Sequence, residues 1–342
     1  MNRIAPMNRI APVNRIAPVN RIAQCLRVMA MACRGKTWPP GSLGRSLLLV
    51  AAATMVIAAL PAGSVEAQTL LRIKESGTLR IGHRADARPF SFVDEAGEPS
   101  GYVVEMCRGV ADGLRQQLGL LELKIEYVEV GTQDRFQAVA DGRVDLLCGS
   151  STVTLSRREF VSFSLPTFVT GVSAVLRADD TSILSEVLSG RRSAAPSRLL
   201  VTEAFRDRVF AVRDGTTAAA WLERNVQNLA RTAQVVKVDD YGKGLQMVAD
   251  GEADAMFGDR AILLDLILQS QMSGDLSIGE THLTYEPYAL ALARGDEDFR
   301  LAVDRELSRI YRSDGIRALF AKYFGRPNET ANILFLLSSL PE

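Results

Sequence analysis

A run of hydroxyl side chains followed by two arginines is the segment of this chain best suited to hold an anion. The run, Ser150–Ser156, comes directly after the apolar segment Val144–Gly149, and Arg157 and Arg158 follow it. The pattern predicts a buried strand, a turn and the first turn of a helix. Free backbone N–H groups at a helix start and a guanidinium both bind carboxylates, so the segment predicts a carboxylate-binding site.

Two other arginines stand at comparable positions. Arg135 belongs to a second predicted helix start, Thr132–Arg135, and Arg84 ends the predicted strand Leu79–Arg84. Ligands of α/β sheets bind outside the carboxyl ends of the strands, so these side chains are expected near one site. Three guanidiniums there indicate a ligand with more than one negative group. The alternative for Arg84 and Arg135 is an ordinary place on a solvated surface.

Strand-like and helix-like segments alternate in two successive parts of the chain. The first part is predicted to contain strand 79–84, hairpin 90–102, helix 103–118, strand 123–130, helix 132–141 and strand 144–148. The second is predicted to contain strand 208–213, a helix after Asp214–Thr217, strand 234–238, helix 241–250, strand 253–257 and helix 261–269. Continuous apolar strands of this kind are typical of a parallel sheet covered on both faces.

Two extended stretches, Thr170–Arg177 and Tyr285–Arg294, separate these parts, and helices at about 297–311 and 315–323 end the pattern. The chain is therefore expected to be an α/β protein with two lobes and a cleft between them. Its second lobe is inserted into the first. The expected bounds are 68–172 and 287–342 for lobe 1, and 173–286 for lobe 2.

The first 67 residues are predicted to be a basic repeat extension followed by a signal peptide. Residues 1–24 are four copies of one hexamer, and Ser46–Leu60 is an uncharged apolar run. A basic segment, an apolar run and the small-residue end Val65–Ala67 are typical of a secretory signal cleaved after Ala67. The alternative is an uncleaved anchor. Export would place the mature chain of 275 residues in the periplasm.

The mature chain is expected to be acidic. Residues 1–67 hold eight of the 40 basic residues and one of the 40 acidic residues, which leaves 32 and 39, a formal net charge of −7. This balance argues against nucleic acid as a partner. Cys107 and Cys148 remain, either as a disulfide or as two separately buried thiols. With His83 and His282 as the two histidines, neither a metal site nor a cofactor is expected.

Short motifs along the whole mature chain resemble those of the extracellular solute-binding proteins of family 3. They are Leu79–Arg84 with Pro89–Phe92, Gly101-Tyr102, Arg135-Phe136 with Asp141–Asp145, Phe163–Pro166, Asp214–Thr217, Asp250–Ala255 and Tyr323–Gly325. The resemblance implies a two-lobed periplasmic-binding-protein fold of type II with two extended hinge crossings. It also implies a monomer that captures an amino acid, closes, and docks on the membrane permease of an ATP-driven (ABC) importer.

The resemblance also assigns roles to single residues. Those expected to hold the α-carboxylate of the ligand are Arg157, Ser150, Thr152, Thr216 and Thr217. Asp259 is expected to take the α-ammonium, which a dry cleft cannot leave unpaired. Asp259 could equally cap the helix that follows it, and the two roles are compatible.

Within the family, the glutamate- and aspartate-binding proteins are the most similar, on Gly82–Arg84, Thr132–Arg135 and Cys148–Thr152. By this resemblance Arg84, Thr132 and Arg135 form the pocket for a side-chain carboxylate. Tyr241 stands where acidic-amino-acid binders often have histidine, and it either lines the pocket or packs nearby. A phenol brings no positive charge, so glutamine or asparagine remain alternative ligands.

Two other classes of function stay open. Some periplasmic dehydratases acting on prephenate-like substrates share this fold, and such chemistry needs a general acid in the cleft. Glu105 and Glu203 are the candidates for that acid, although neither is singled out by its surroundings in the sequence. The other class is a sensory domain of a larger signalling protein, and the short tail Arg326–Glu342 argues against it. The expected function is therefore binding without a reaction.

Overall fold

The structure is a computed structural model that describes residues 68–189, 197–280 and 282–341. The repeats and the signal peptide predicted for residues 1–67 lie outside this range. The described residues all belong to one compact unit of the chain. Within them, every helix is too short or too polar to cross a membrane.

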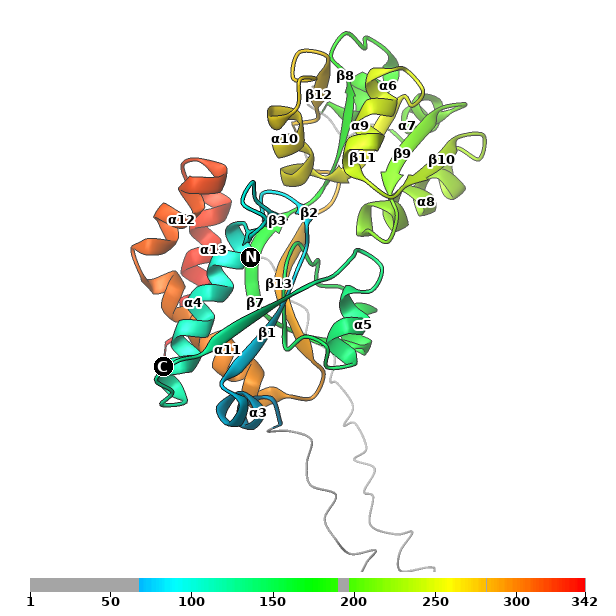
Figure 1. Ribbon diagram of the computed structural model, residues 1–342. Helices are drawn as coiled ribbons and strands as arrows, with labels where there is room; N and C mark the ends of the chain where they lie inside the picture. Colours follow the sequence, from blue (N-terminus) through cyan, green and yellow to red (C-terminus); the bar gives the residue numbers. More distant parts are fainter. Residues whose placement is uncertain (1–67, 190–196, 281, 342) are drawn as a thin grey trace, which may run out of the picture. The chain divides into compact units, whose positions relative to one another are not determined.

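The first sheet has five strands in the order β5-β1-β6-β13-β7. Its strands are β1 (Thr78–His83), β5 (Lys124–Glu129), β6 (Leu146–Cys148), β7 (Val161–Thr170) and β13 (Glu286–Ala293). The strands β5, β1 and β6 run parallel, and β13 runs antiparallel to both β6 and β7. The sheet is thus assembled from two distant parts of the chain, with β13 between two strands of the first part (Figure 1).

Helices cover both faces of this sheet. On one face are α3 (Gln68–Ser76), α4 (Tyr102–Gln117), α11 (Glu297–Arg312), α12 (Gly315–Phe324) and α13 (Glu329–Ser338). The short helix α5 (Arg135–Ala140) packs on the other face, where Ala138 and Val139 contact apolar strand residues such as Leu147. Cover on both faces explains why β6 is entirely apolar and fully buried.

The second sheet also has five strands, in the order β10-β9-β11-β8-β12. Its strands are β8 (Val172–Arg177), β9 (Val209–Arg213), β10 (Gln234–Val238), β11 (Ala255–Asp259) and β12 (Leu276–Ile278). The helices that pack around it are α6 (Ile183–Leu188), α7 (Arg198–Phe205), α8 (Thr217–Leu229), α9 (Tyr241–Ala249) and α10 (Arg260–Gln269). Both sheets therefore follow the alternating pattern that the sequence predicts.

Two extended crossings connect the sheets. The chain leaves the first sheet at the end of β7, passes Gly171 and enters the second sheet as β8; it returns along β13. Glu286 pairs with Thr170 where the crossings lie side by side. A Cβ at Gly171 would lie 1.7 Å from the carbonyl oxygen of Thr284, so this close approach requires glycine. The predicted insertion of the second lobe into the first is confirmed.

One predicted element is wrong, and several are longer, shorter or new. Arg157 and Arg158 do not begin an α-helix: they form one 3₁₀ turn, η2 (Arg157–Glu159), and the chain then enters β7. Val161 is fully buried and pairs with Ala293, so strand pairing overrides the local helical pattern. The helix predicted from Thr132 begins only at Arg135. The pattern also missed α3, α13, β12 and β2 (Asp86–Ala87).

The predicted hairpin at 90–102 is confirmed in outline. It consists of β3 (Ser91–Val93) and β4 (Pro99–Ser100), and β2 pairs with the outer side of β3. Asp94 Oδ1 accepts hydrogen bonds from the backbone N–H groups of Ala96 and Glu98, which fixes the turn.

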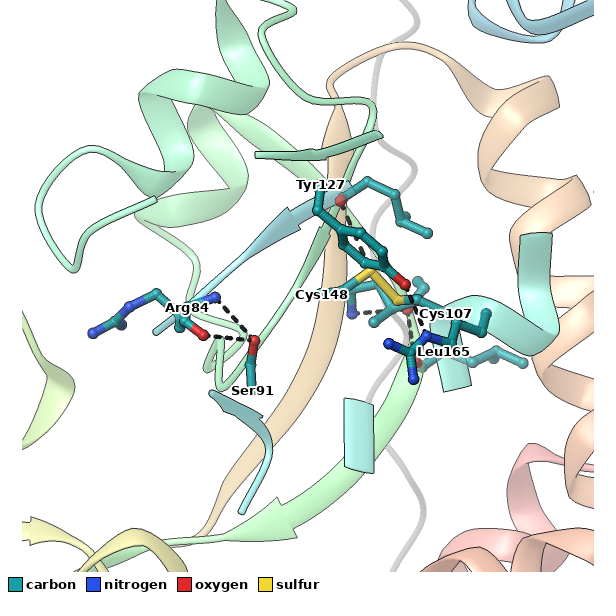
Figure 2. Close-up of a disulfide and its surroundings, with 10 residues drawn as sticks. Arg84, Ser91, Cys107, Tyr127, Cys148 and Leu165 are labelled. Atoms are coloured by element: carbon teal, nitrogen blue, oxygen red, sulfur yellow. Dashed lines mark hydrogen bonds between the residues drawn. A yellow bond between two sulfur atoms is a disulfide. The ribbon is translucent and has the colours of Figure 1, made fainter. Parts of the chain in front are cut away.

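Cys107 and Cys148 form a disulfide, which decides between the two alternatives left by the sequence. It joins α4 to the end of β6, with 6.4 Å between the Cα atoms (Figure 2). Both cysteines are completely buried. The cross-link fixes the strand end from which the hydroxyl-rich loop Gly149–Thr152 starts.

Removing the disulfide is expected to lower the free energy of unfolding. The bridge spans 41 residues. Closing a loop of that length lowers the entropy of the unfolded chain, which stabilises the folded state by about 4 kcal/mol. Cys148→Ala and the double variant Cys107→Ala/Cys148→Ala should lose a similar amount, about 2–4 kcal/mol in urea denaturation. A single substitution already breaks the disulfide. If the loss of unfolding free energy were twice as large in the double variant, lost side-chain packing and not the open loop would be its cause.

Candidate ligand-binding site

All ten residues predicted to bind the ligand line one cavity. They are Arg84, Thr132, Arg135, Ser150, Thr152, Arg157, Thr216, Thr217, Tyr241 and Asp259. The empty space at this cavity, open side included, is about 410 Å³. The wall is shared by both sheets, at or just beyond the carboxyl ends of β1, β6, β9 and β11. The strand-end rule thus agrees with the expectation that Arg84, Arg135 and Arg157 lie near one site, and the family resemblance supplied the other residues.

Arg135 is a buried cation that has no counter-ion among the described residues. Its side chain donates to the carbonyl oxygens of Thr132 and Gly215, and its Nε finds no acceptor among the described residues. No carboxylate in the described ranges forms an ion pair with it. Burial, helped by the charges of Arg157 and Arg84, lowers the pKa of Arg135 to about 9. The cavity thus holds a positive charge that an anionic ligand group would neutralise.

Arg157 and Arg135 both lie over the aromatic ring of Phe136. The two guanidiniums lie 4.9 Å and 4.6 Å from the centre of the Phe136 ring. Arg157 Nη1 also donates to the carbonyl oxygen of Thr152 at 2.8 Å. Burial lowers the pKa of Arg157, while Tyr288 and Glu286 act in the opposite direction. The ring stabilises both positive charges through cation–π interactions.

Arg84 is held by a group of charges that the sequence analysis did not predict. Its Nη2 lies 2.5 Å from Asp86 Oδ1, and the other oxygen of Asp86 pairs with Arg213 at the end of β9. The Arg84 backbone N–H donates to Ser91 Oγ, as Figure 2 shows. Burial opposes the charged form of Asp86, but the two arginines outweigh it and hold its pKa below the usual value.

The Asp86–Arg213 pair links the short strand β2 of the first part of the chain to the end of β9 in the second sheet. Arg213 also lies over the ring of Tyr241, 4.9 Å from its centre, and its side chain is 8% exposed. Arg213 ends a predicted strand of the second part just as Arg84 ends one of the first. The same reasoning from strand ends would have found it.

The hydroxyl groups of Thr152, Thr216 and Thr217 have two different kinds of partner. Thr216 caps α8: its Oγ1 accepts from the N–H of Ala219 at 3.1 Å and donates to the carbonyl oxygen of Arg213. The hydroxyls of Thr152 and Thr217 both donate to Oε2 of Glu286, at 2.9 Å and 2.6 Å. Thr216 therefore shapes the site through the helix start, and its hydroxyl is already used.

Asp259 caps a helix inside the cavity, as one of its two expected roles requires. Its Oδ1 accepts from the N–H groups of Ala261 and Ile262, and its Oδ2 accepts from the hydroxyl of Tyr288 at 2.5 Å. Burial raises the pKa of Asp259 to about 6, against these hydrogen bonds. The carboxylate is desolvated and has no cation among its described partners, so a ligand ammonium would stabilise its charged form.

Tyr241 was expected either to line the pocket or to pack nearby. It does both, because it lines the cavity and is buried under Arg213. Glu286 and Tyr288 line the cavity too, and the sequence analysis missed them. Both lie on β13, which the pattern treated only as a connection. Their spacing of two places both side chains on one face of the strand, and a carboxylate beside an apolar run was the available signal.

The two acids considered for enzymatic chemistry do not line the cavity. Glu105 on α4 binds Lys322 and Tyr323, and Glu203 on α7 pairs with Arg206 on the surface. Among the described residues, no cluster of His, Cys, Asp and Glu has the form of a metal site.

Comparisons with known proteins agree with this geometry. The family model of bacterial extracellular solute-binding proteins, family 3, matches residues 79–326. An L-glutamate/L-aspartate-binding protein of Pseudomonas aeruginosa is 29% identical over 80% of this chain and 87% of its own. An L-cystine-binding protein of Escherichia coli is 25% identical over 83% of this chain and 96% of its own.

Solved structures share the fold. An ancestral amino-acid-binding protein, described as a precursor of cyclohexadienyl dehydratase, aligns with a TM-score of 0.61 at 24% identity. The alignment covers 75% of this chain and 100% of the ancestral protein. The predicted type II periplasmic-binding-protein fold is confirmed.

Proposed function

Because the chain belongs to the bacterial extracellular solute-binding proteins of family 3, we propose that it captures an acidic amino acid, glutamate or aspartate, for an ABC importer. The observation that carries this proposal is the buried Arg135, whose guanidinium has no carboxylate partner among the described residues. A side-chain carboxylate of the ligand would supply that partner. A ligand with a neutral side chain would leave the charge buried and unpaired.

The charges of the cavity match the charges of an acidic amino acid. Arg157, the hydroxyl groups around it and the start of α8 face the α-carboxylate. Asp259 takes the α-ammonium, and Arg84 and Arg135 take the side-chain carboxylate together with Thr132. A guanidinium can bind a carboxylate with two parallel hydrogen bonds, which lysine cannot do. Each of the three charged groups of glutamate would thus have an oppositely charged partner in the cavity.

The working cycle is binding followed by closure, without a chemical step. Lobe 1 (68–172 and 287–342) and lobe 2 (173–286) close on the ligand by rotation about the two crossings, near Gly171 and Glu286. The closed monomer then docks on the permease. Secretion through the N-terminal signal, with cleavage after Ala67, delivers the protein to the periplasm. The relative named for glutamate and aspartate supports the choice of ligand, whereas the cystine-binding relative marks a neutral alternative.

Calorimetry with a panel of amino acids tests the proposal. The protein is unfolded and refolded to remove carried-over ligand, then titrated with glutamate, aspartate, glutamine, asparagine, cystine, lysine and leucine. We expect tight exothermic binding of glutamate or aspartate and no heat with lysine or leucine. Amides that bind as tightly as the acids would show that Tyr241 has relaxed the selectivity. If neither glutamate nor aspartate gave a heat of binding, the proposal of an acidic amino acid as the ligand would be wrong.

A further inference from the structure

One carboxylate of the protein already occupies hydroxyl groups that the proposed ligand needs. Oε2 of Glu286 accepts hydrogen bonds from the hydroxyl groups of Thr152, on the loop after β6, and of Thr217, in the first turn of α8. The other oxygen, Oε1, accepts from Thr284 at 2.9 Å. Glu286 also favours the charged form of Arg157. Three of the groups assigned to the ligand α-carboxylate thus already face an internal carboxylate.

A count of protons shows why both carboxylates cannot use these groups together. A threonine hydroxyl has one proton to donate. While Thr152 and Thr217 donate to Glu286, they present only lone pairs to any second carboxylate. Two carboxylates at one desolvated site also repel each other. An α-carboxylate can therefore bind these hydroxyls only after Glu286 releases them.

The position of Glu286 connects this exchange to movement of the lobes. Glu286 begins β13, the crossing that returns to the first sheet, and it pairs with Thr170 at the end of the other crossing. Thr152 belongs to the first lobe and Thr217 to the second, and their hydroxyl oxygens lie 3.5 Å apart. A single oxygen atom of Glu286 therefore bridges the two lobes at the hinge.

An outer cavity adjoins the site at the same place. It is lined by Thr152, Arg157, Thr217 and Glu286, as the inner cavity is, and also by Trp221 and Arg224. Its empty space, open side included, is about 920 Å³. A displaced Glu286 side chain thus has room beside it, with the exposed Arg224 on the wall of that space.

We propose that Glu286 is an affinity-setting residue: an internal carboxylate that occupies the α-carboxylate subsite in the ligand-free protein and bridges the lobes there. The ligand displaces it, and the free energy of that displacement is subtracted from the binding free energy. This inference rests on the proposed function, since it takes an amino acid as the ligand. The alternative role for Glu286, a second acceptor for the ligand ammonium, predicts a change of affinity in the opposite direction.

Glu286→Gln removes the charge and keeps the shape of the side chain. Calorimetry on the stripped protein should show glutamate binding at least about tenfold tighter than in the unsubstituted protein, because hydrogen bonds to a charged acceptor no longer have to be broken. Glu280→Gln is the matched control, since it removes the same charge from an exposed side chain on the same return segment. It should leave the affinity unchanged. Unchanged or weaker glutamate binding in Glu286→Gln would overturn the proposal.

Solution scattering of the ligand-free protein tests the bridge without any ligand. Glu286→Ala removes the acceptor altogether, so its radius of gyration should exceed that of the unsubstituted protein and of Glu280→Gln. Circular dichroism confirms that each variant is folded. An unchanged radius in folded Glu286→Ala would contradict the bridge. If the unsubstituted protein binds no amino acid, the proposed function fails, whereas the scattering comparison still decides whether Glu286 holds the lobes together.

Discussion

Replacing Arg135 with methionine is expected to abolish binding of acidic amino acids and, at the same time, to stabilise the ligand-free fold. The guanidinium is buried, lies near two other arginines and has no carboxylate partner among the described residues. Methionine fills a similar volume without a charge. Binding should weaken by at least about thirtyfold, since truncating one partner of a buried charge pair costs about 2–5 kcal/mol. The free energy of unfolding should rise by roughly 1–3 kcal/mol, because an uncompensated buried charge is removed.

Two measurements on the same variant separate these effects. Calorimetry gives the affinity for glutamate, and urea denaturation without ligand gives the free energy of unfolding. Arg158→Met is the control, because Arg158 is exposed and lies outside the cavity. Glutamate binding retained in Arg135→Met would remove the main support for an acidic ligand. A less stable variant would mean that the hydrogen bonds to Thr132 and Gly215 outweigh the cost of the buried charge.

The site residues that lie at the ends of strands could be predicted from the local sequence. Arg84 follows β1, Thr152 follows β6, Thr216 follows β9 and Asp259 ends β11. The apolar runs fix where each strand stops, and the topology of an α/β sheet brings those ends to one edge. The roles of Thr216 and Asp259 as helix caps follow from the same local chemistry, because both are preferred residues at that position.

The features of the site that depend on contacts between distant segments could not be predicted from the local sequence. The 3₁₀ turn at Arg157 gives way to β7 because Val161 pairs with Ala293, far along the chain. Glu286 and Tyr288 enter the cavity because β13 runs between the two lobes, and the Asp86–Arg213 pair exists because β2 meets the end of β9. Glu286 brings a charge into the cavity and the Asp86–Arg213 pair holds Arg84 beside it, so both features bear on affinity and selectivity.

Asp259 is expected to make ligand binding depend on pH and on its own charge. Burial raises its pKa to about 6 in the ligand-free protein. A bound ammonium favours the carboxylate and lowers that pKa, so binding releases a proton whenever the free protein holds one. Affinity should be constant above about pH 6.5 and fall by up to about tenfold per unit as the pH drops below 6. The side-chain carboxyl of glutamate has a pKa near 4.3 and is less than about one-tenth protonated above about pH 5.3, so a loss of affinity between about pH 5.3 and 6 reports titration of the protein.

Asp259→Asn separates the charge from the helix cap. Asparagine can accept the same hydrogen bonds from Ala261 and Ile262, so α10 should stay intact, whereas glutamate binding should weaken by at least about thirtyfold. The pH series is repeated in Glu286→Gln, because Glu286 is the other carboxyl group lining the cavity. Loss of affinity on acidification that persists in Glu286→Gln assigns the titration to Asp259. A constant affinity between about pH 5.3 and 7 would mean that the ammonium binds elsewhere, and the clamp would then lack its acidic partner.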